Sequence, residues 1–213
     1  MDIEVAVKEL PLVAILRGLE GDQIKDVGRI LIDAGFTLIE VTMNSMRPLQ
    51  SLEILANMAG SDAVIGAGTV TSVPAVKAVK NAGGRFVISP NMDQEVIRAT
   101  KNCGLVSWPG VFTPSEAFDA LKYGADGLKL FPGEALSPQI VKAYRAVLPL
   151  GTRIFVVGGV KSSNMAQYLA AGADGFGIGS SLAHAGKSLT DIAKDAAEIV
   201  TSYDAVRKSI SHD

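Results

Sequence analysis

The chain has 213 residues, with 20 basic and 22 acidic side chains and a net charge of −2. This length suits one domain with one large core, so we expect a single domain over residues 1–213. The balanced charge offers no basic surface for nucleic acid or anionic lipid, which leaves a small molecule as the expected partner.

The first ten residues carry acidic side chains where an export signal would need a positive stretch followed by an apolar run. We expect them to form a short helix before the first strand. No apolar stretch reaches the ~18 residues that span a bilayer, and the one cysteine, Cys103, cannot form an internal disulfide. The sequence therefore predicts a cytoplasmic protein that does not bind a membrane.

Eight short, apolar segments follow one another along the chain, as expected for buried parallel strands. They cover residues 12–16, 37–42, 64–67, 86–89, 105–108, 127–131, 153–157 and 175–178. Between them lie helical patterns such as 22–34, 73–82 and 164–171, whose apolar residues recur at helical spacing. Seven helix-to-strand junctions carry a glycine, which ends a helix in the left-handed conformation without steric cost. These glycines are Gly35, Gly60, Gly83, Gly104, Gly124, Gly151 and Gly172.

Eight β-α units in one chain of this size predict an α/β fold of the closed (β/α)8 TIM-barrel type. An open, doubly wound sheet is the structural alternative. In a barrel, functional residues collect at the carboxyl ends of the strands and in the loops that follow them.

Two charged residues lie inside apolar strands. Lys129 alone among 12 lysines does so, and strand alternation turns it toward the barrel axis while Leu128 and Leu130 face the helices. Burial lowers the pKa of a lysine toward the range in which a neutral amine can attack a ketone. Glu40 alone among 22 acidic residues is placed in the same way, and it is the natural proton-transfer partner. The alternative is a buried structural ion pair between the two, which is costly to desolvate.

Polar groups and glycines also follow the strands. Arg17 ends the first strand and Thr69 the third, and both suit a carboxylate or phosphate. The seventh strand runs into Gly158 and Gly159, and the eighth runs into Gly179 and Ser180. Glycine lets a backbone approach an anion, and a short helix that starts near Ser180 would present its amides to a phosphate. Tight turns at barrel corners are the structural alternative.

Metal chemistry is not expected. A zinc-dependent enzyme would need several imidazoles, and the chain has only His184, on a predicted surface helix, and His212, in the terminal tail. We therefore predict no metal and no cofactor, and a nucleophilic route through Lys129.

At these residues the sequence resembles the class I 2-keto-3-deoxy-6-phosphogluconate and 2-keto-3-deoxy-6-phosphogalactonate aldolases over nearly its full length. The similar segments are residues 14–18, 39–41, 65–70, 89–91, 127–132 and 157–160. The resemblance implies that Lys129 forms a Schiff base and that Glu40 shuttles protons. It also implies a homotrimer, and the following substrate-binding residues: Arg17, Thr69, Pro90, Phe131, Val157, Gly158, Gly159, Gly179 and Ser180.

Two positions distinguish the branches of this family. The gluconate branch usually has an arginine four residues after the catalytic glutamate and a threonine before the paired glycines, whereas this chain has Asn44 and Val157. Both residues resemble the galactonate branch. Trp108 and the pair Gly133 and Glu134 are less typical of either branch.

The expected reaction is therefore cleavage of 2-dehydro-3-deoxy-6-phosphogalactonate to pyruvate and D-glyceraldehyde 3-phosphate. One alternative is the gluconate epimer, or both epimers, as substrate. A more distant alternative is a barrel isomerase or decarboxylase that binds phosphate and uses Lys129 without a covalent bond. A barrel that only binds a sugar phosphate is the non-enzymatic alternative.

Overall fold

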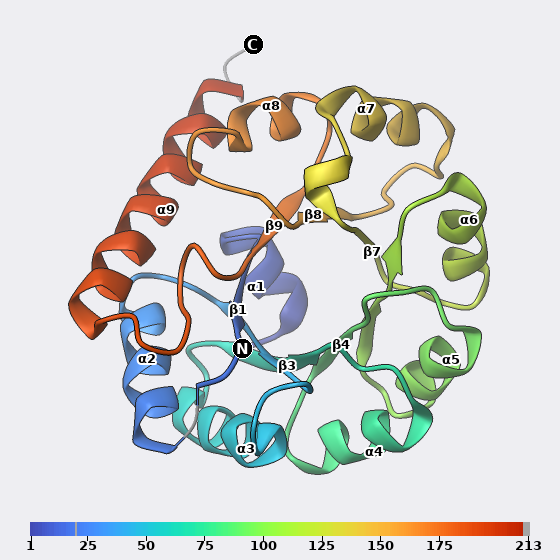
Figure 1. The fold of residues 1–213 in the computed structure, drawn as a ribbon. Coiled ribbons are helices and arrows are strands. Elements are labelled where there is room, and N and C mark those ends of the chain that lie inside the picture. The colour runs from blue at the N-terminus through green and yellow to red at the C-terminus, as the bar shows by residue number, and fades with distance from the viewer. Residues whose placement is uncertain (20, 211–213) are drawn as a thin grey trace.

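The computed structural model describes residues 1–19 and 21–210, and the predicted tail residue His212 lies outside them. All strands of this part of the chain form one parallel sheet in the order β5-β4-β3-β2-β1-β9-β8-β7-β6. The strands are β1 (Leu12–Leu16), β2 (Leu38–Thr42), β3 (Val64–Gly68), β4 (Phe86–Ile88), β5 (Val106–Trp108), β6 (Gly110–Val111), β7 (Leu128–Leu130), β8 (Ile154–Val157) and β9 (Gly175–Ile178). Apart from the N-terminal helix, the helices surround this sheet as an outer ring, which confirms the predicted TIM barrel (Figure 1).

Pro109 directly follows the predicted fifth strand and separates β5 from β6. β5 pairs with β4, and β6 pairs with β7, so the sheet closes through the single residue between β5 and β6. Pro109 has no backbone N–H to donate, but its carbonyl accepts from the Lys129 amide at 2.9 Å. The predicted strand of residues 105–108 therefore continues as β6 after an interruption.

The helices form where the sequence pattern predicts them. They are α1 (Ile3–Glu9), α2 (Gly21–Asp33), α3 (Pro48–Ala59), α4 (Val73–Asn81), α5 (Gln94–Asn102), α6 (Pro114–Lys122), α7 (Pro138–Val147), α8 (Met165–Ala170) and α9 (Leu189–Ile210), with a 3-10 turn η1 (Gly133–Ala135). Side chains cap several of them, and α6 begins with a full capping box between Thr113 and Glu116. All seven predicted junction glycines have positive φ. Six of them lie within two residues of a helix end, as predicted, whereas Gly151 lies beyond the end of α7, whose C-cap is Leu148.

Two apolar layers follow from strand alternation. Leu128 and Leu130 belong to the larger layer between sheet and helices, as predicted. The smaller layer lies inside the barrel and contains Phe86, Trp108 and Phe155, whose rings pack on one another with centroids 5.3 and 4.8 Å apart. Both charged strand residues, Lys129 and Glu40, are buried.

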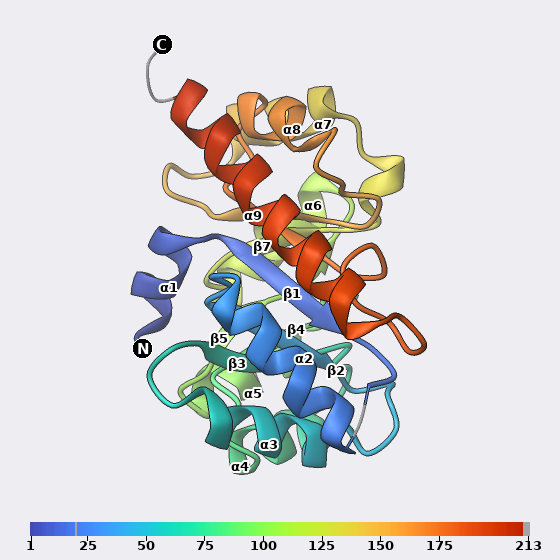
Figure 2. The ribbon, with the colours of Figure 1, turned by 90° about the vertical axis from the view of Figure 1, so that its left-hand side faces the viewer.

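Helix α1 closes one end of the barrel. Its residues Ile3, Ala6 and Val7 are buried in the inner apolar layer. Figure 2 shows α1 at the end where β1 begins, opposite the loop between β9 and α9. The barrel is therefore closed at its amino-terminal end. In the described part of the chain no helix is both long and apolar enough to cross a membrane.

Candidate active site

Lys129 occupies the middle of β7. Its neighbours Leu128 and Leu130 face the helices, so its own side chain faces the barrel axis, where it is 7% exposed. The ammonium nitrogen Nζ lies 4.5 Å from the centroid of the Phe131 ring. Burial lowers the pKa of Lys129; the Glu40 charge opposes this effect, and the Arg17 charge adds to it. The amine is thereby moved toward its neutral, nucleophilic form.

Glu40 occupies the matching position in β2. It is 1% exposed, and within residues 1–19 and 21–210 its Oε2 atom has no hydrogen-bond partner. Burial raises the pKa of Glu40 to about 7, although the positive charges of Lys129 and Arg17 pull it down. A buried carboxyl group with a free oxygen and this pKa is suited to accepting and returning a proton near neutral pH.

A glycine of the neighbouring strand makes room for the Glu40 carboxyl group. A Cβ atom at Gly68 would lie 1.4 Å from Glu40 Oε1 and 2.2 Å from its Cδ. Only glycine therefore fits beside Glu40 in this arrangement. Gly68 was not among the predicted site residues. Its contact with Glu40 depends on the register of β2 and β3, in which Thr42 pairs with Gly68, and the residue pattern of a single strand does not reveal this register.

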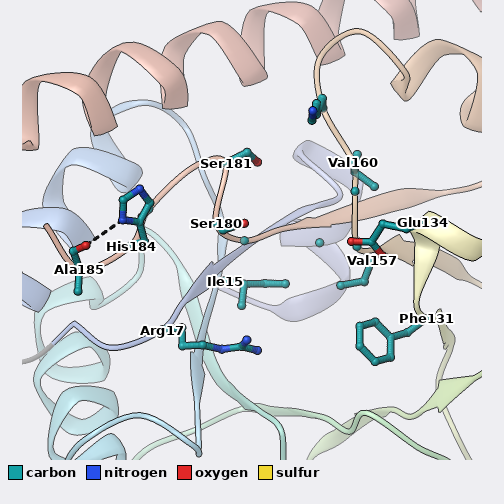
Figure 3. A pocket seen from close by; sticks show the side chains of 16 residues that line it. Ile15, Arg17, Phe131, Glu134, Val157, Val160, Ser180, Ser181, His184 and Ala185 are labelled. Carbon is teal, nitrogen blue, oxygen red and sulfur yellow. Dashed lines mark hydrogen bonds between the residues drawn. The ribbon is translucent and has the colours of Figure 1, made fainter. Parts of the chain in front are cut away.

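A cavity of about 570 Å³ opens at the carboxyl ends of β8, β9, β1 and β7. Most of the predicted substrate-binding residues line it: Arg17, Phe131, Val157, Gly158, Gly159, Gly179 and Ser180. Figure 3 shows the Arg17 side chain extended from β1 toward the side of the cavity where Phe131 lies. Lys129 and Glu40 do not line the cavity. Phe131 does line it, and Lys129 packs against the Phe131 ring.

Thr69 and Pro90 do not line this cavity. Both follow their strands, β3 and β4, and both are partly exposed. Thr69 has φ +57°, a conformation that is rare for a β-branched residue. Their predicted contact with substrate stays a prediction.

Two loops bring unpaired backbone amides to the cavity. Gly158 and Gly159 have φ values of +105° and +67°. In the described parts of the chain, the amides of Gly159, Ser180 and Ser181 have no hydrogen-bond acceptor. Loops with unpaired amides form concave sites that suit anions. The predicted helix near Ser180 is a single turn instead, in which the Leu182 and Ala183 amides donate to Gly179 O at 2.9 and 3.2 Å.

The cavity wall also contains charged residues that sequence reasoning missed. Lys161 and Glu134 both line it, and Figure 3 shows Glu134 beside Val157. The Glu134 side chain lies over the two glycines, since a Cβ atom at Gly158 would lie 2.3 Å from Glu134 Oε2. Neither residue lies in a strand, so no alternation pattern marks it.

His184 also lines the cavity, and the prediction that it lies on a surface helix is wrong. It belongs to the exposed loop between β9 and α9, where its Nδ1 atom lies 2.8 Å from the Ala185 carbonyl oxygen (Figure 3). Among the described residues no three His, Cys, Asp or Glu side chains are grouped to hold a metal ion. A metal-free reaction stays a prediction.

A small hydrogen-bond network supports the loop that carries Arg17. The Gly18 amide donates to Ser45 Oγ at 3.0 Å, and Ser45 Oγ lies 3.0 Å from Thr42 Oγ1 at the end of β2. The network ties the ends of β1 and β2 together. The site thus combines a buried amine, a buried carboxyl group, a guanidinium and a set of free amides, which together suit covalent chemistry on a ketone with an anionic group.

Comparison with known proteins gives one consistent result. A family model described as "KDPG and KHG aldolase" matches residues 3–200. The chain is 46% identical over 198 residues to the "Probable 2-dehydro-3-deoxy-6-phosphogalactonate aldolase" of Rhizobium meliloti strain 1021, with 93% of each chain covered. It is 43% identical to the "2-dehydro-3-deoxy-6-phosphogalactonate aldolase" of Escherichia coli strain K12, with 92% of this chain and 95% of the relative covered.

A solved structure gives the same match in three dimensions. The structure described as "Native KDPGal structure" superposes with a TM-score of 0.92 at 42% sequence identity, with 94% of this chain and 97% of that chain covered.

Proposed function

The chain belongs to the KDPG and KHG aldolase family, and on this premise we propose that it is a Schiff-base aldolase that cleaves 2-dehydro-3-deoxy-6-phosphogalactonate. The products are pyruvate and D-glyceraldehyde 3-phosphate. The observation that carries the proposal is Lys129, a buried lysine with a lowered pKa that faces the barrel axis beside the cavity. The galactonate form is favoured over the gluconate form by the names of the two relatives that are 43% and 46% identical.

The first step is attack of the neutral Lys129 amine on the C2 ketone. Protonation of the hydroxyl group of the adduct and loss of water give an iminium ion, which draws electrons from the C3–C4 bond. The buried position of Lys129 favours this step because desolvation disfavours the protonated amine.

Glu40 then moves the protons. As a carboxylate it accepts the proton of the C4 hydroxyl group, directly or through a water molecule, while the C3–C4 bond breaks and the aldehyde leaves. The remaining enamine takes that proton back at C3. Hydrolysis of the iminium ion frees pyruvate and restores the amine. A pKa of about 7 allows Glu40 to act in both directions at neutral pH.

The phosphate is proposed to bind in the cavity at the unpaired amides of Gly159 and Ser180. Arg17 lies in the same cavity and lowers the pKa of both Glu40 and Lys129, so its charge reaches the reacting end. It is proposed to hold the substrate carboxylate. Thr69, Pro90, Phe131, Val157, Gly158 and Gly179 are proposed to complete the binding site.

Trapping with borohydride tests the covalent step. The protein is incubated with pyruvate and borohydride, and the modified peptide is mapped by mass spectrometry. The expected result is one pyruvyl-derived adduct, on Lys129. The variant Lys129→Ala should keep the fold, by circular dichroism, and lose both adduct and turnover; an adduct on another lysine, or turnover by this variant, would contradict the proposal.

The remaining finer proposals have separate tests. The kcat/KM values for the two C4 epimers decide between the galactonate and gluconate forms.

We also propose a cytoplasmic homotrimer. The half-exposed aromatic side chains of Phe112 and Phe118 support it as candidates for a subunit contact. Light scattering should then give three times the chain mass of 22.2 kDa.

A further inference from the structure

The loop after β9 carries the amides of Ser180 and Ser181 and also a partly buried lysine, Lys187. Lys187 Nζ donates to Ser181 O at 2.7 Å and to Leu182 O at 2.8 Å. Its third donor binds Asp195 of α9, and the Lys187 side chain is 13% exposed. All three donors of the ammonium group are therefore used within the protein.

In the turn of residues 179–183, the amides and the carbonyls have different hydrogen-bond partners. The amides of Leu182 and Ala183 donate to Gly179 O, and the carbonyls of Ser181 and Leu182 accept from Lys187. This leaves the Ser180 and Ser181 amides without an acceptor in the described parts of the chain, in residues that line the cavity (Figure 3). Each peptide group is planar, so the Ser181 and Leu182 carbonyls that Lys187 holds fix the amides of Leu182 and Ala183, which share their planes. These two amides hold Gly179 O, and the plane of that carbonyl contains the Ser180 N–H, so Lys187 acts on the free Ser180 amide through this chain of hydrogen bonds.

We infer that Lys187 is a positioning residue, which holds the turn of residues 179–183 from its carbonyl side and thereby orients the free Ser180 amide toward the substrate phosphate. The inference rests on the proposed function. Lys187 itself does not line the cavity. Asp195 anchors Lys187 to α9, so the orientation of the turn depends on a helix outside the site.

The test compares a reaction that needs the phosphate with one that does not. Exchange of the pyruvate C3 protons with deuterium requires only the Schiff base and the proton relay. In Lys187→Met we expect the KM for the phosphorylated substrate and the inhibition constant of inorganic phosphate to rise together, by about tenfold. The kcat/KM of pyruvate exchange should stay within about twofold, because charge-assisted bonds at the turn do not touch Lys129.

Lys194→Met is the matched control. Lys194 is an exposed lysine of α9 next to Asp195, and the variant removes the same charge without releasing the turn. It should leave phosphate affinity unchanged. Asp195→Asn should show a smaller form of the Lys187→Met effect, and the double variant should add little to Lys187→Met alone.

Two results would overturn the inference: phosphate affinity that does not change in Lys187→Met, or pyruvate exchange that falls as far as phosphate affinity. If Lys187→Met does not fold, Lys187→Gln keeps an NH2 group with two of the three donors and should show an intermediate loss of phosphate affinity; no loss would also overturn the inference. Failure of the unchanged protein to form a pyruvate adduct would instead refute the proposed function. Direct titration with inorganic phosphate still tests the role of Lys187 in that case.

Discussion

At the scale of single residues, the barrel interior shifts two pKa values in opposite directions. Burial raises the pKa of Glu40 and lowers that of Lys129, and each shift favours the neutral form. The sequence was sufficient to predict both positions, because a charged side chain in an apolar strand stands out from its neighbours. It was not sufficient to predict Gly68, whose importance depends on the Glu40 side chain in the adjacent strand.

Glu40→Gln should change how stability depends on pH. The Glu40 pKa is raised from 4.5 to about 7 on folding, so its contribution to stability is complete below pH 4.5 and is lost as the pH rises through 7. Relative to Glu40→Gln, the unchanged protein should lose about 3 kcal/mol of unfolding free energy between pH 4.5 and pH 8. Urea unfolding at several pH values measures this difference.

Glu53→Gln, at an exposed position of α3, provides the control. Its stability relative to the unchanged protein should not vary over the same range. If Glu40→Gln behaves in the same way as this control, the Glu40 pKa is not raised in the folded protein.

Gly68→Ala should remove activity by displacing the Glu40 carboxyl group. The new Cβ atom would lie 1.4 Å from Glu40 Oε1, so the side chain must move. We expect kcat to fall about 100-fold or more, the size of a lost general acid–base group. In the background of Glu40→Gln the same change should cost little further activity; two full, additive losses would show that Gly68 acts independently of Glu40.

At the scale of elements, the glycine pattern predicted the alternation of helices and strands well. All seven junction glycines have the expected positive φ, and six of them lie within two residues of a helix end, because a helix end is a local feature that one residue type satisfies. The pattern predicted the ends of individual elements less well. The break between β5 and β6 depends on where Pro109 falls in the sheet, and the predicted helix near Ser180 is replaced by a turn whose carbonyls accept from Lys187.

Two similar segments, residues 124–127 and 172–175, lead into β7 and β9, and each has an aspartate that joins neighbouring elements. Asp126 Oδ2 accepts from the Ser107 amide at 2.8 Å and Asp126 pairs with Lys101. Asp174 Oδ2 accepts from the Ile154 amide at 2.6 Å and pairs with Arg145. Each aspartate thus fixes the start of its strand to an earlier strand, β5 for Asp126 and β8 for Asp174.

Asp174→Ala should therefore destabilise the barrel without changing the chemistry. The Ile154 amide would lose its acceptor and Arg145 its partner, which should lower the free energy of unfolding by about 2–3 kcal/mol. Denaturant titration measures this loss. Asp33→Ala, at an exposed position of α2, should change stability by less than about 0.5 kcal/mol. Equal effects of the two variants would contradict a joining role for Asp174.

At the scale of the whole molecule, α1 completes the inner apolar layer. Val7 is 7% exposed there, whereas Val5 of the same helix is 46% exposed. Val7→Ser should lower the free energy of unfolding by about 2 kcal/mol, because it places a hydroxyl group in an apolar layer and leaves a small cavity. Val5→Ser should have an effect below about 0.5 kcal/mol. Thermal unfolding of the two variants measures this difference in stability. Equal transition temperatures would show that α1 is not part of the core.

The closed amino-terminal end has a kinetic consequence for the proposed reaction. With α1 and the Phe86, Trp108 and Phe155 rings filling that end, substrate and both products share the opening at the carboxyl end. In the proposed reaction the pyruvate unit would be bound to buried Lys129 and would lie behind the phosphorylated aldehyde. The aldehyde must then depart before hydrolysis releases pyruvate, and in the synthetic direction pyruvate must enter first, which makes the kinetic mechanism ordered.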